Sequence, residues 1–341
     1  MTDLSKVVVE GHTLRSVVGL LSTRLQSTGI IILLVLMIFV FFAIINPRFT
    51  NSINLINILN QSSYLTLVAL GQGLVLISGG FDLAIAGVVG LTSVITASLL
   101  VFLEAHGVNL PVALTLALMG GLTVGALIGW LNGIAVAYMN IPSLIVTLGA
   151  GGIAAGIGYE VSGGIPVTGL PDAFMQWFGT PDLLSISTSV YIALGLAVVL
   201  QFIMTRTRSG RYIYAVGGGA AAARLSGISV KRYILMVFVA SGVLASLAGI
   251  LLSARVATGD TNLGGDFVLQ SITAGVLGGI SLRGGEGKIH GAVLGSFFIA
   301  ILSNGMNLEN VSSYYQMMIL GALLILAVLA EQVRIARAGR V

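Results

Sequence analysis

A series of apolar segments, each long enough to cross a lipid bilayer, limits what this chain can fold into. Charged residues make up only 8% of the sequence, against roughly a quarter in a soluble domain. The segments show no strand-like alternation, and in lipid a helix satisfies its own backbone hydrogen bonds. We therefore predict an all-α polytopic transmembrane bundle of about ten spans, near residues 28–46, 58–79, 83–103, 111–138, 142–161, 188–205, 233–256, 267–282, 289–307 and 312–331.

The basic residues indicate how these segments are oriented. Fourteen of the sixteen lie before the first segment, in two alternate gaps between segments, and at the end of the chain. The other gaps collect acidic residues such as Glu104, Glu160 and Asp172. Because cytoplasmic loops carry an excess of Lys and Arg, we predict that both termini and residues 206–232 face the cytoplasm, with residues 162–187 outside.

We expect residues 1–341 to form a single transmembrane domain with no separate soluble part. Residues 1–27 would be a cytoplasmic N-terminal segment. Apolar residues recur at helical spacing from Leu14 to Leu25, which suits an amphipathic helix on the membrane surface; a disordered polar tail fits residues 1–11 better. No small-residue cleavage site follows the first apolar run, so we interpret it as a retained span.

The outer loop, residues 162–187, contains a short stretch that begins at Asp172 and carries Phe174, Trp177 and Phe178. It suits a helix of one or two turns at the outer interface, where Trp is favoured. The stretch has two interpretations, a docking surface for an extracytoplasmic partner or an aromatic anchor, and the sequence does not separate them.

Several kinds of chemistry are not supported by the sequence. The chain has no cysteine, which excludes disulfides and thiolate metal sites. Residues 284–288 are glycine-rich but lack the earlier glycine and the Ser or Thr of a phosphate-binding loop. We find no nucleophile–base arrangement, so we expect neither an enzyme nor a cofactor. Topology explains the basic residues, and we expect no nucleic-acid partner.

Polar residues inside or at the ends of the spans are candidates for a solute path. Amide side chains can hydrogen-bond sugar hydroxyls, although they also serve as contacts between helices, worth about 0.6–2 kcal/mol per bond. For Asp82, an N-terminal cap on the third span is the favoured alternative. The candidates favour a polar, uncharged solute over an ion: Asn60, Gln61, Gln72, Asp82, Asn132, Thr147, Gln270 and Asn304.

Glycines recur at every fourth position in three of the predicted spans. Such stripes allow helix backbones to approach closely. We interpret them as packing within the subunit rather than as a seam between subunits. They are Gly121, Gly125, Gly129 and Gly133, then Gly152 and Gly156, then Gly291 and Gly295.

Over about residues 40–330, ordered motifs resemble the membrane subunit of ribose-type sugar ABC importers, in the simple-sugar and branched-chain amino acid permease family. The stretch around Arg211 is the most specific. The motifs are Asn46-Pro47-Arg48-Phe49-Thr50, Gly79-Gly80-Phe81-Asp82-Leu83, Gly210-Arg211-Tyr212-Ile213-Tyr214-Ala215-Val216-Gly217-Gly218, Ala223-Arg224-Leu225-Ser226-Gly227-Ile228, Leu277-Gly278-Gly279 and Val311-Ser312-Ser313-Tyr314-Tyr315-Gln316.

The resemblance implies a type II ABC importer fold in the bacterial inner membrane. It implies four partners: a cytoplasmic ABC ATPase subunit, a periplasmic sugar-binding protein, a second permease subunit (a copy or a related chain) and a sugar substrate. It also implies a short cytoplasmic coupling helix that docks on the ATPase. In this sequence the coupling residues map to Arg211, Ala220, Ala221, Ala222, Ala223, Arg224, Leu225, Ser226 and Gly227.

The sequence departs from the family pattern at three places, and other classes of transporter remain alternatives. Gly219 and Ala220 replace an Asn-Glu pair, residues 84–86 read Ala-Ile-Ala after Asp82, and residues 268–270 read Val-Leu-Gln. These changes bear on which sugar is carried. A self-sufficient secondary transporter would need a coupling-ion site, for which we find no carboxylate pair in the membrane. A channel would have no need of the basic loop at 206–232.

Overall fold

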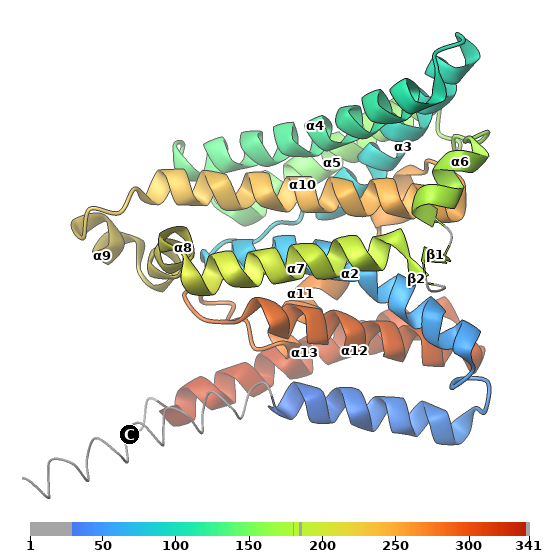
Figure 1. Cartoon of the computed structure of the whole chain (residues 1–341). Helices are drawn as coiled ribbons and strands as arrows, with labels where there is room; N and C mark the ends of the chain where they lie inside the picture. The colour runs from blue at the N-terminus through green and yellow to red at the C-terminus, as the bar shows by residue number, and fades with distance from the viewer. Residues whose placement is uncertain (1–28, 180, 184–185, 339–341) are drawn as a thin grey trace, which may run out of the picture.

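The computed structural model describes residues 29–179, 181–183 and 186–338, and this part of the chain is almost entirely helical (Figure 1). The all-α prediction is confirmed. Seven of the described helices are long and apolar enough to cross a membrane: α3 (Ile85–Ala105), α4 (Leu110–Ala137), α5 (Ser143–Ser162), α7 (Thr188–Arg206), α10 (Val230–Val256), α12 (Ile289–Leu308) and residues 313–333 of α13 (Ser313–Ala338).

The other three predicted spans are also helices, but shorter or more polar ones. They are Gly29–Ile45, α2 (Ser52–Ile77) and α11 (Phe267–Leu277). The count of ten is therefore approximate. α2 starts six residues before its predicted start because the side chain of Asn51 accepts a hydrogen bond from the backbone nitrogen of Ile53. α11 ends five residues early, before a glycine pair in which Gly279 has a φ of +83°.

α2 is the central helix of the bundle. It is buried almost continuously from Ser62 to Ile77 and packs against α7, α10, α11 and α12. The peripheral helices Gly29–Ile45, α5 and α13 instead expose many large apolar side chains. An apolar outer surface on helices that satisfy their own backbone hydrogen bonds is the arrangement expected of a protein that lies in a bilayer.

Glycines form the contact between α4 and α10. A Cβ added at Gly125 or Gly129 would overlap backbone carbonyl oxygens of α10, and one added at Gly242 would overlap that of Gly125. Gly291 and Gly295 of α12 meet α11 in the same way. Packing within the subunit is therefore confirmed for these stripes. It is wrong for Gly152 and Gly156 of α5, which have no atom within 4 Å of an added Cβ.

The two ends of the bundle carry different short elements (Figure 1). At one end lie α6 (Asp172–Phe174), the π-helix η1 (Met175–Gly179) and a hairpin of β1 (Pro181–Leu183) and β2 (Ile186–Ser187). The short helix predicted in the outer loop is thus present. At the opposite end lie α8 (Arg208–Gly218) and α9 (Ala220–Leu225). The amphipathic helix predicted between Leu14 and Leu25 lies outside the described residues.

Candidate functional site

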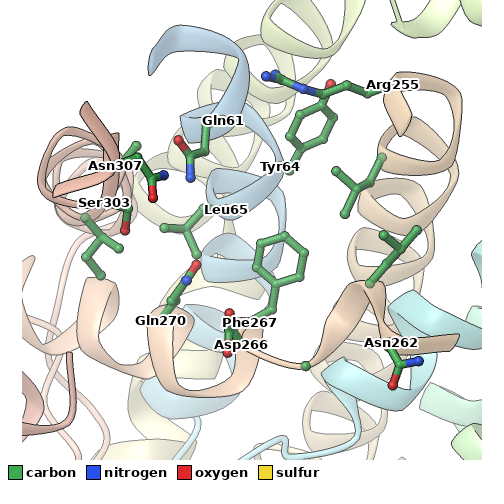
Figure 2. Close-up of a pocket in the computed structure, with 15 residues that line it drawn as sticks. Gln61, Tyr64, Leu65, Arg255, Asn262, Asp266, Phe267, Gln270, Ser303 and Asn307 are labelled. Atoms are coloured by element: carbon green, nitrogen blue, oxygen red, sulfur yellow. The ribbon is translucent and has the colours of Figure 1, made fainter. Parts of the chain in front are cut away.

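A polar cavity of about 510 Å³ lies between α2, α10, α11 and α12, toward the end of the bundle that carries α6 (Figures 1 and 2). Two residues predicted for the solute path, Gln61 and Gln270, line it. The lining also includes apolar and charged side chains. The full set is Gln61, Tyr64, Leu65, Leu252, Arg255, Asn262, Leu263, Gly265, Asp266, Phe267, Gln270, Ile299, Ala300, Ser303 and Asn307.

Tyr64 of α2 and Arg255 of α10 bring unsatisfied hydrogen-bonding groups to this cavity. Tyr64 is 2% exposed, and its hydroxyl has no hydrogen-bond partner within the described chain. The guanidinium of Arg255 lies 5.8 Å from the centre of the Tyr64 ring, and its buried Nη1 atom is likewise unpartnered there. Since unmade buried hydrogen bonds cost free energy, these two groups suit a polar guest.

The short helix η2 (Thr261–Gly264) holds one wall of the cavity in place. Asp260 caps η2 by accepting a hydrogen bond from the backbone nitrogen of Asn262 at 2.8 Å. The hydroxyl of Ser93 in α3 bonds both the backbone nitrogen of Asp260, at 3.1 Å, and its carbonyl oxygen, at 3.0 Å. Tyr159 of α5 donates to Asn262 at 2.8 Å. Lining residues after α10 are therefore fixed by contacts to α3 and α5.

Six of the eight predicted path residues lie outside the cavity lining, and two of these connect helices. Asn304 of α12 and Asn54 of α2 exchange two amide hydrogen bonds of 2.9 Å. The hydroxyl of Thr147 in α5 accepts from the backbone nitrogen of Leu83 at 2.9 Å and donates to the carbonyl of Ser143 at 2.8 Å. These side chains act as contacts between segments, which was the alternative interpretation.

Three more predicted residues are buried in the helix core. Asn132 of α4 is 2% exposed and Gln72 of α2 is fully buried. Neither amide atom of Gln72 has a partner in the part of the chain described, and the Oδ1 atom of Asn60 is similarly unpartnered. None of the three lines the cavity.

Asp82 does not cap α3, so that prediction is wrong. α3 starts at Ile85 with Ala84 as its N-cap. One carboxylate oxygen of Asp82 closes the preceding turn by accepting from the backbone nitrogen of Ala84 at 3.0 Å. The other accepts from the hydroxyl of Ser241 in α10 at 2.7 Å. Asp82 thus fastens the connection between α2 and α3 to α10.

At the opposite end of the bundle, α9 occupies the stretch in which a short helix was predicted. Gly227 has a φ of +78°, and a pair of 3.0 Å hydrogen bonds, Gly227 N to Arg224 O and Ile228 N to Ala223 O, closes the helix end. Ala223 packs among Val216 and Val230, whereas Leu225 is 92% exposed. α9 therefore rests on the bundle by one face and presents Arg224 and Leu225 outward.

α8, which the sequence did not predict, joins α9 to the bundle. The carbonyl of Ile77 at the end of α2 accepts from Gly285 N at 2.8 Å, and Gly217 of α8 lies against the same carbonyl. The Tyr214 hydroxyl donates to the carbonyl of Gly287 at 2.8 Å, and burial raises its pKa above the usual value of 10.0. We call this meeting of α2, α8 and the loop after α11 the glycine junction, formed by Gly79, Gly217, Gly218, Gly284 and Gly285.

Residues 54–328 match the family of permease components of branched-chain amino acid transport systems. The chain belongs to this permease family. The permease is 37% identical over 310 residues to the ribose import permease protein of Escherichia coli, covering 90% of this chain and 94% of that one. It is 34% identical over 304 residues to the D-allose transport system permease protein of Escherichia coli, covering 89% and 91%. No solved structure matches.

A further relative is the galactose/methyl galactoside import permease protein of Salmonella typhimurium. It is 34% identical over 328 residues, which cover 92% of this permease and 96% of that protein.

Sequence reasoning missed thirteen of the fifteen residues that line the cavity of the permease, among them Tyr64, Arg255 and Asp266. One signal was present. Arg255 is one of only two basic residues outside the gaps predicted to be cytoplasmic. Tyr64 carries no such signal because α2 is buried around most of its circumference, so no stripe in the sequence marks the side that faces the cavity.

Proposed function

We propose that this chain is the membrane-spanning permease subunit of a binding-protein-dependent ABC importer that carries a monosaccharide or a related neutral polar solute. The observation that carries the proposal is the similarity, over about nine-tenths of the chain, to proteins named as ribose, allose and galactose permeases. The helices long and apolar enough to span a membrane support a multi-pass location in the bacterial inner membrane.

We propose that α8 and α9, within residues 206–232, face the cytoplasm and bind the ABC ATPase subunit through Arg211 and Ala220–Gly227. Three observations support this. The segment is basic, it lies at one end of the bundle (Figure 1), and Leu225 and Arg224 are exposed on a short helix. An exposed leucine on a surface helix suits a hydrophobic groove in a partner.

The remaining partners follow from the same proposal. A periplasmic sugar-binding protein would dock at the end that carries α6 and the hairpin, and a second permease subunit, identical or related, would complete the pathway. Both termini, including residues 1–27, would be cytoplasmic, and residues 1–341 would act as one permease domain. Of the predicted path residues, we keep Gln61 and Gln270 in the path. We assign Asp82, Thr147 and Asn304 to contacts within the subunit. The buried residues Asn60, Gln72 and Asn132 lie outside the cavity lining.

The test is to purify the tagged full-length chain from membranes of its own host and to identify the proteins that accompany it. A nucleotide-hydrolysing subunit, with uptake of labelled ribose, allose or galactose that needs both ATP and a binding protein, is the expected result. Uptake that continues without ATP would favour a channel, and uptake driven by an ion gradient would favour a secondary transporter.

A further inference from the structure

We propose that the cavity between α2, α10, α11 and α12 is a binding site for one neutral monosaccharide inside a single permease subunit, with the Tyr64 hydroxyl and the Arg255 guanidinium binding its hydroxyl groups. The inference rests on the proposed function, because it takes the solute to be a sugar. It goes further by assigning the site and the residues that bind.

The two unpartnered groups carry the argument. The Tyr64 hydroxyl can donate and accept a hydrogen bond, and the guanidinium of Arg255 can only donate. Both atoms are buried and lack partners in the described residues, and both residues line the same cavity from different helices. The hydroxyls of a sugar donate and accept, so a sugar can offer each group a partner.

The size and shape of the cavity fit a small solute. Its volume of about 510 Å³ falls within the roughly 300–1,000 Å³ of small-molecule sites. Figure 2 shows side chains from several helices converging on one space, with Gln61, Gln270 and Asn307 on the side away from Arg255. Amides on that side can hydrogen-bond the hydroxyls of a sugar, and Asn307 can do so through its Nδ2 group because its Oδ1 atom already accepts from Gln316 at 2.7 Å.

The charges in the lining favour a neutral ligand over an ion. Arg255 and Asp266 both line the cavity and lie at different parts of it in Figure 2. An anion would be attracted to the guanidinium but repelled by the carboxylate. A cation would be attracted to the carboxylate but repelled by the guanidinium. Phe267 and Leu65 supply apolar surface on which the C–H face of a sugar ring can pack.

The test compares Tyr64→Phe with a matched control, Thr96→Val, in the assembled transporter. Tyr64→Phe removes only the hydroxyl and keeps the ring beneath Arg255. Thr96 in α3 is also fully buried, with a hydroxyl that has no partner in the described chain, but it does not line the cavity. Uptake of ribose, allose and galactose is measured for each variant and divided by wild-type uptake, so that the affinity of the binding protein cancels.

We expect Tyr64→Phe to lower uptake of at least one sugar by about three- to tenfold, the value of one hydrogen bond, with Thr96→Val unchanged. Equal uptake by both variants and the wild type would overturn the site while leaving the proposed function intact. Equal losses in both variants would also overturn it, because they would indicate packing. Absence of sugar uptake by the wild type would overturn the proposed function and this inference with it.

A second measurement does not depend on the folding of Tyr64→Phe. The chain has no cysteine, so Asn307→Cys at the rim of the cavity gives a single alkylation site in the purified full chain. Ser229→Cys, an exposed position next to α9, is the control. Slower alkylation of Asn307→Cys alone in the presence of ribose, allose or galactose supports the site. No protection by any of these sugars would contradict it.

Discussion

The two ends of this permease differ in packing density: one contains a cavity and the other a close contact between backbones. At the cavity, polar side chains from four helices surround empty space, and hydroxyl and guanidinium groups lack partners in the described chain. At the glycine junction, backbones touch without side chains between them, so that an added Cβ at Gly217 would overlap the carbonyl of Ile77. The first end is the one that we propose admits the solute, and the backbones at the second end cannot shift without moving their neighbours.

This difference assigns two tasks to two ends of the molecule: the glycine junction would transmit movement, and the cavity would hold the solute. A dense backbone contact transmits displacement because packed interiors have low compressibility. The glycine junction connects α8 to the end of α2, and α2 runs on through the bundle to the cavity residues Gln61 and Tyr64. A displacement at α9 would therefore reach the cavity along one continuous helix.

The variant with the largest expected effect is Gly217→Ala, which tests whether the glycine junction is tightly packed. Its Cβ would meet backbone atoms of Ile77 and Gly285, so we expect a loss of about 1–3 kcal/mol of stability together with loss of uptake. Gly218→Ala is the control, since its Cβ would lie 4.0 Å from the nearest atom, the Cα of Gly285. Thermal unfolding in detergent measures both; equal stability of the two variants would show that the junction is not tightly packed.

Gly227→Ala has a smaller expected effect, through backbone strain alone. An added Cβ would meet no atom within 4 Å, but the φ of +78° disfavours a side chain by about 1–2 kcal/mol. We expect the end of α9 to shift and sugar-stimulated ATP hydrolysis to fall. Gly219→Ala, at the other end of α9, is the control, because Gly219 has an extended φ of 170° and an added Cβ would make only an ordinary contact, 3.9 Å from the Cβ of Ala222. Wild-type hydrolysis by Gly227→Ala would argue against a coupling role for α9.

Gly265→Ala sharpens the comparison at the other end. Gly265 lines the cavity, and an added Cβ would meet only the carbonyl oxygen of Asn262, at 3.5 Å, so we expect stability within about 1 kcal/mol of wild type, below the usual 1–3 kcal/mol cost of overpacking. The control is Gly295→Ala in the closely packed contact of α11 with α12, where an added Cβ would overlap the carbonyl of Ala274. Chemical or thermal unfolding should separate the two variants; similar losses would mean that the cavity is not open space.

Two cysteine variants with no expected effect on stability test which end faces the cytoplasm. Thr168→Cys lies in the loop before α6 and Ser229→Cys follows α9, and both positions are exposed. In spheroplasts, an impermeant thiol reagent should label Thr168→Cys and leave Ser229→Cys unlabelled until the membrane is broken. The reverse pattern would invert the proposed orientation and place the cavity on the cytoplasmic side.

The sequence predicted helices well where length and hydropathy decide the outcome, and poorly where tertiary contacts do. α8 contains three glycines, which disfavour an isolated helix. It is helical because Ile213 and Val216 pack onto the bundle, and packing supplies most of the stability of short helices.

Only two of the fifteen residues that line the cavity were predicted, for a related reason. Gln61 and Gln270 stood out as amides in apolar spans, and so did Gln72 and Asn132, which are buried elsewhere. A helix that is apolar on all sides gives no periodic signal of its orientation. Asp266 belongs to the lining because η2 turns the chain back over the end of α10, a reversal that depends on the bonds of Asp260.

The glycine contact between α4 and α10 also has a genetic consequence. Any missense change of a glycine codon adds a side chain of at least one carbon, and at Gly125 and Gly129 that carbon would overlap backbone carbonyl oxygens of α10. Substitutions in α4 should therefore be rare at every fourth residue along the face that meets α10 and more frequent on the other faces. The lipid-facing surface of α4 can change during evolution without affecting packing. The contact between α4 and α10 can change only if both helices change together.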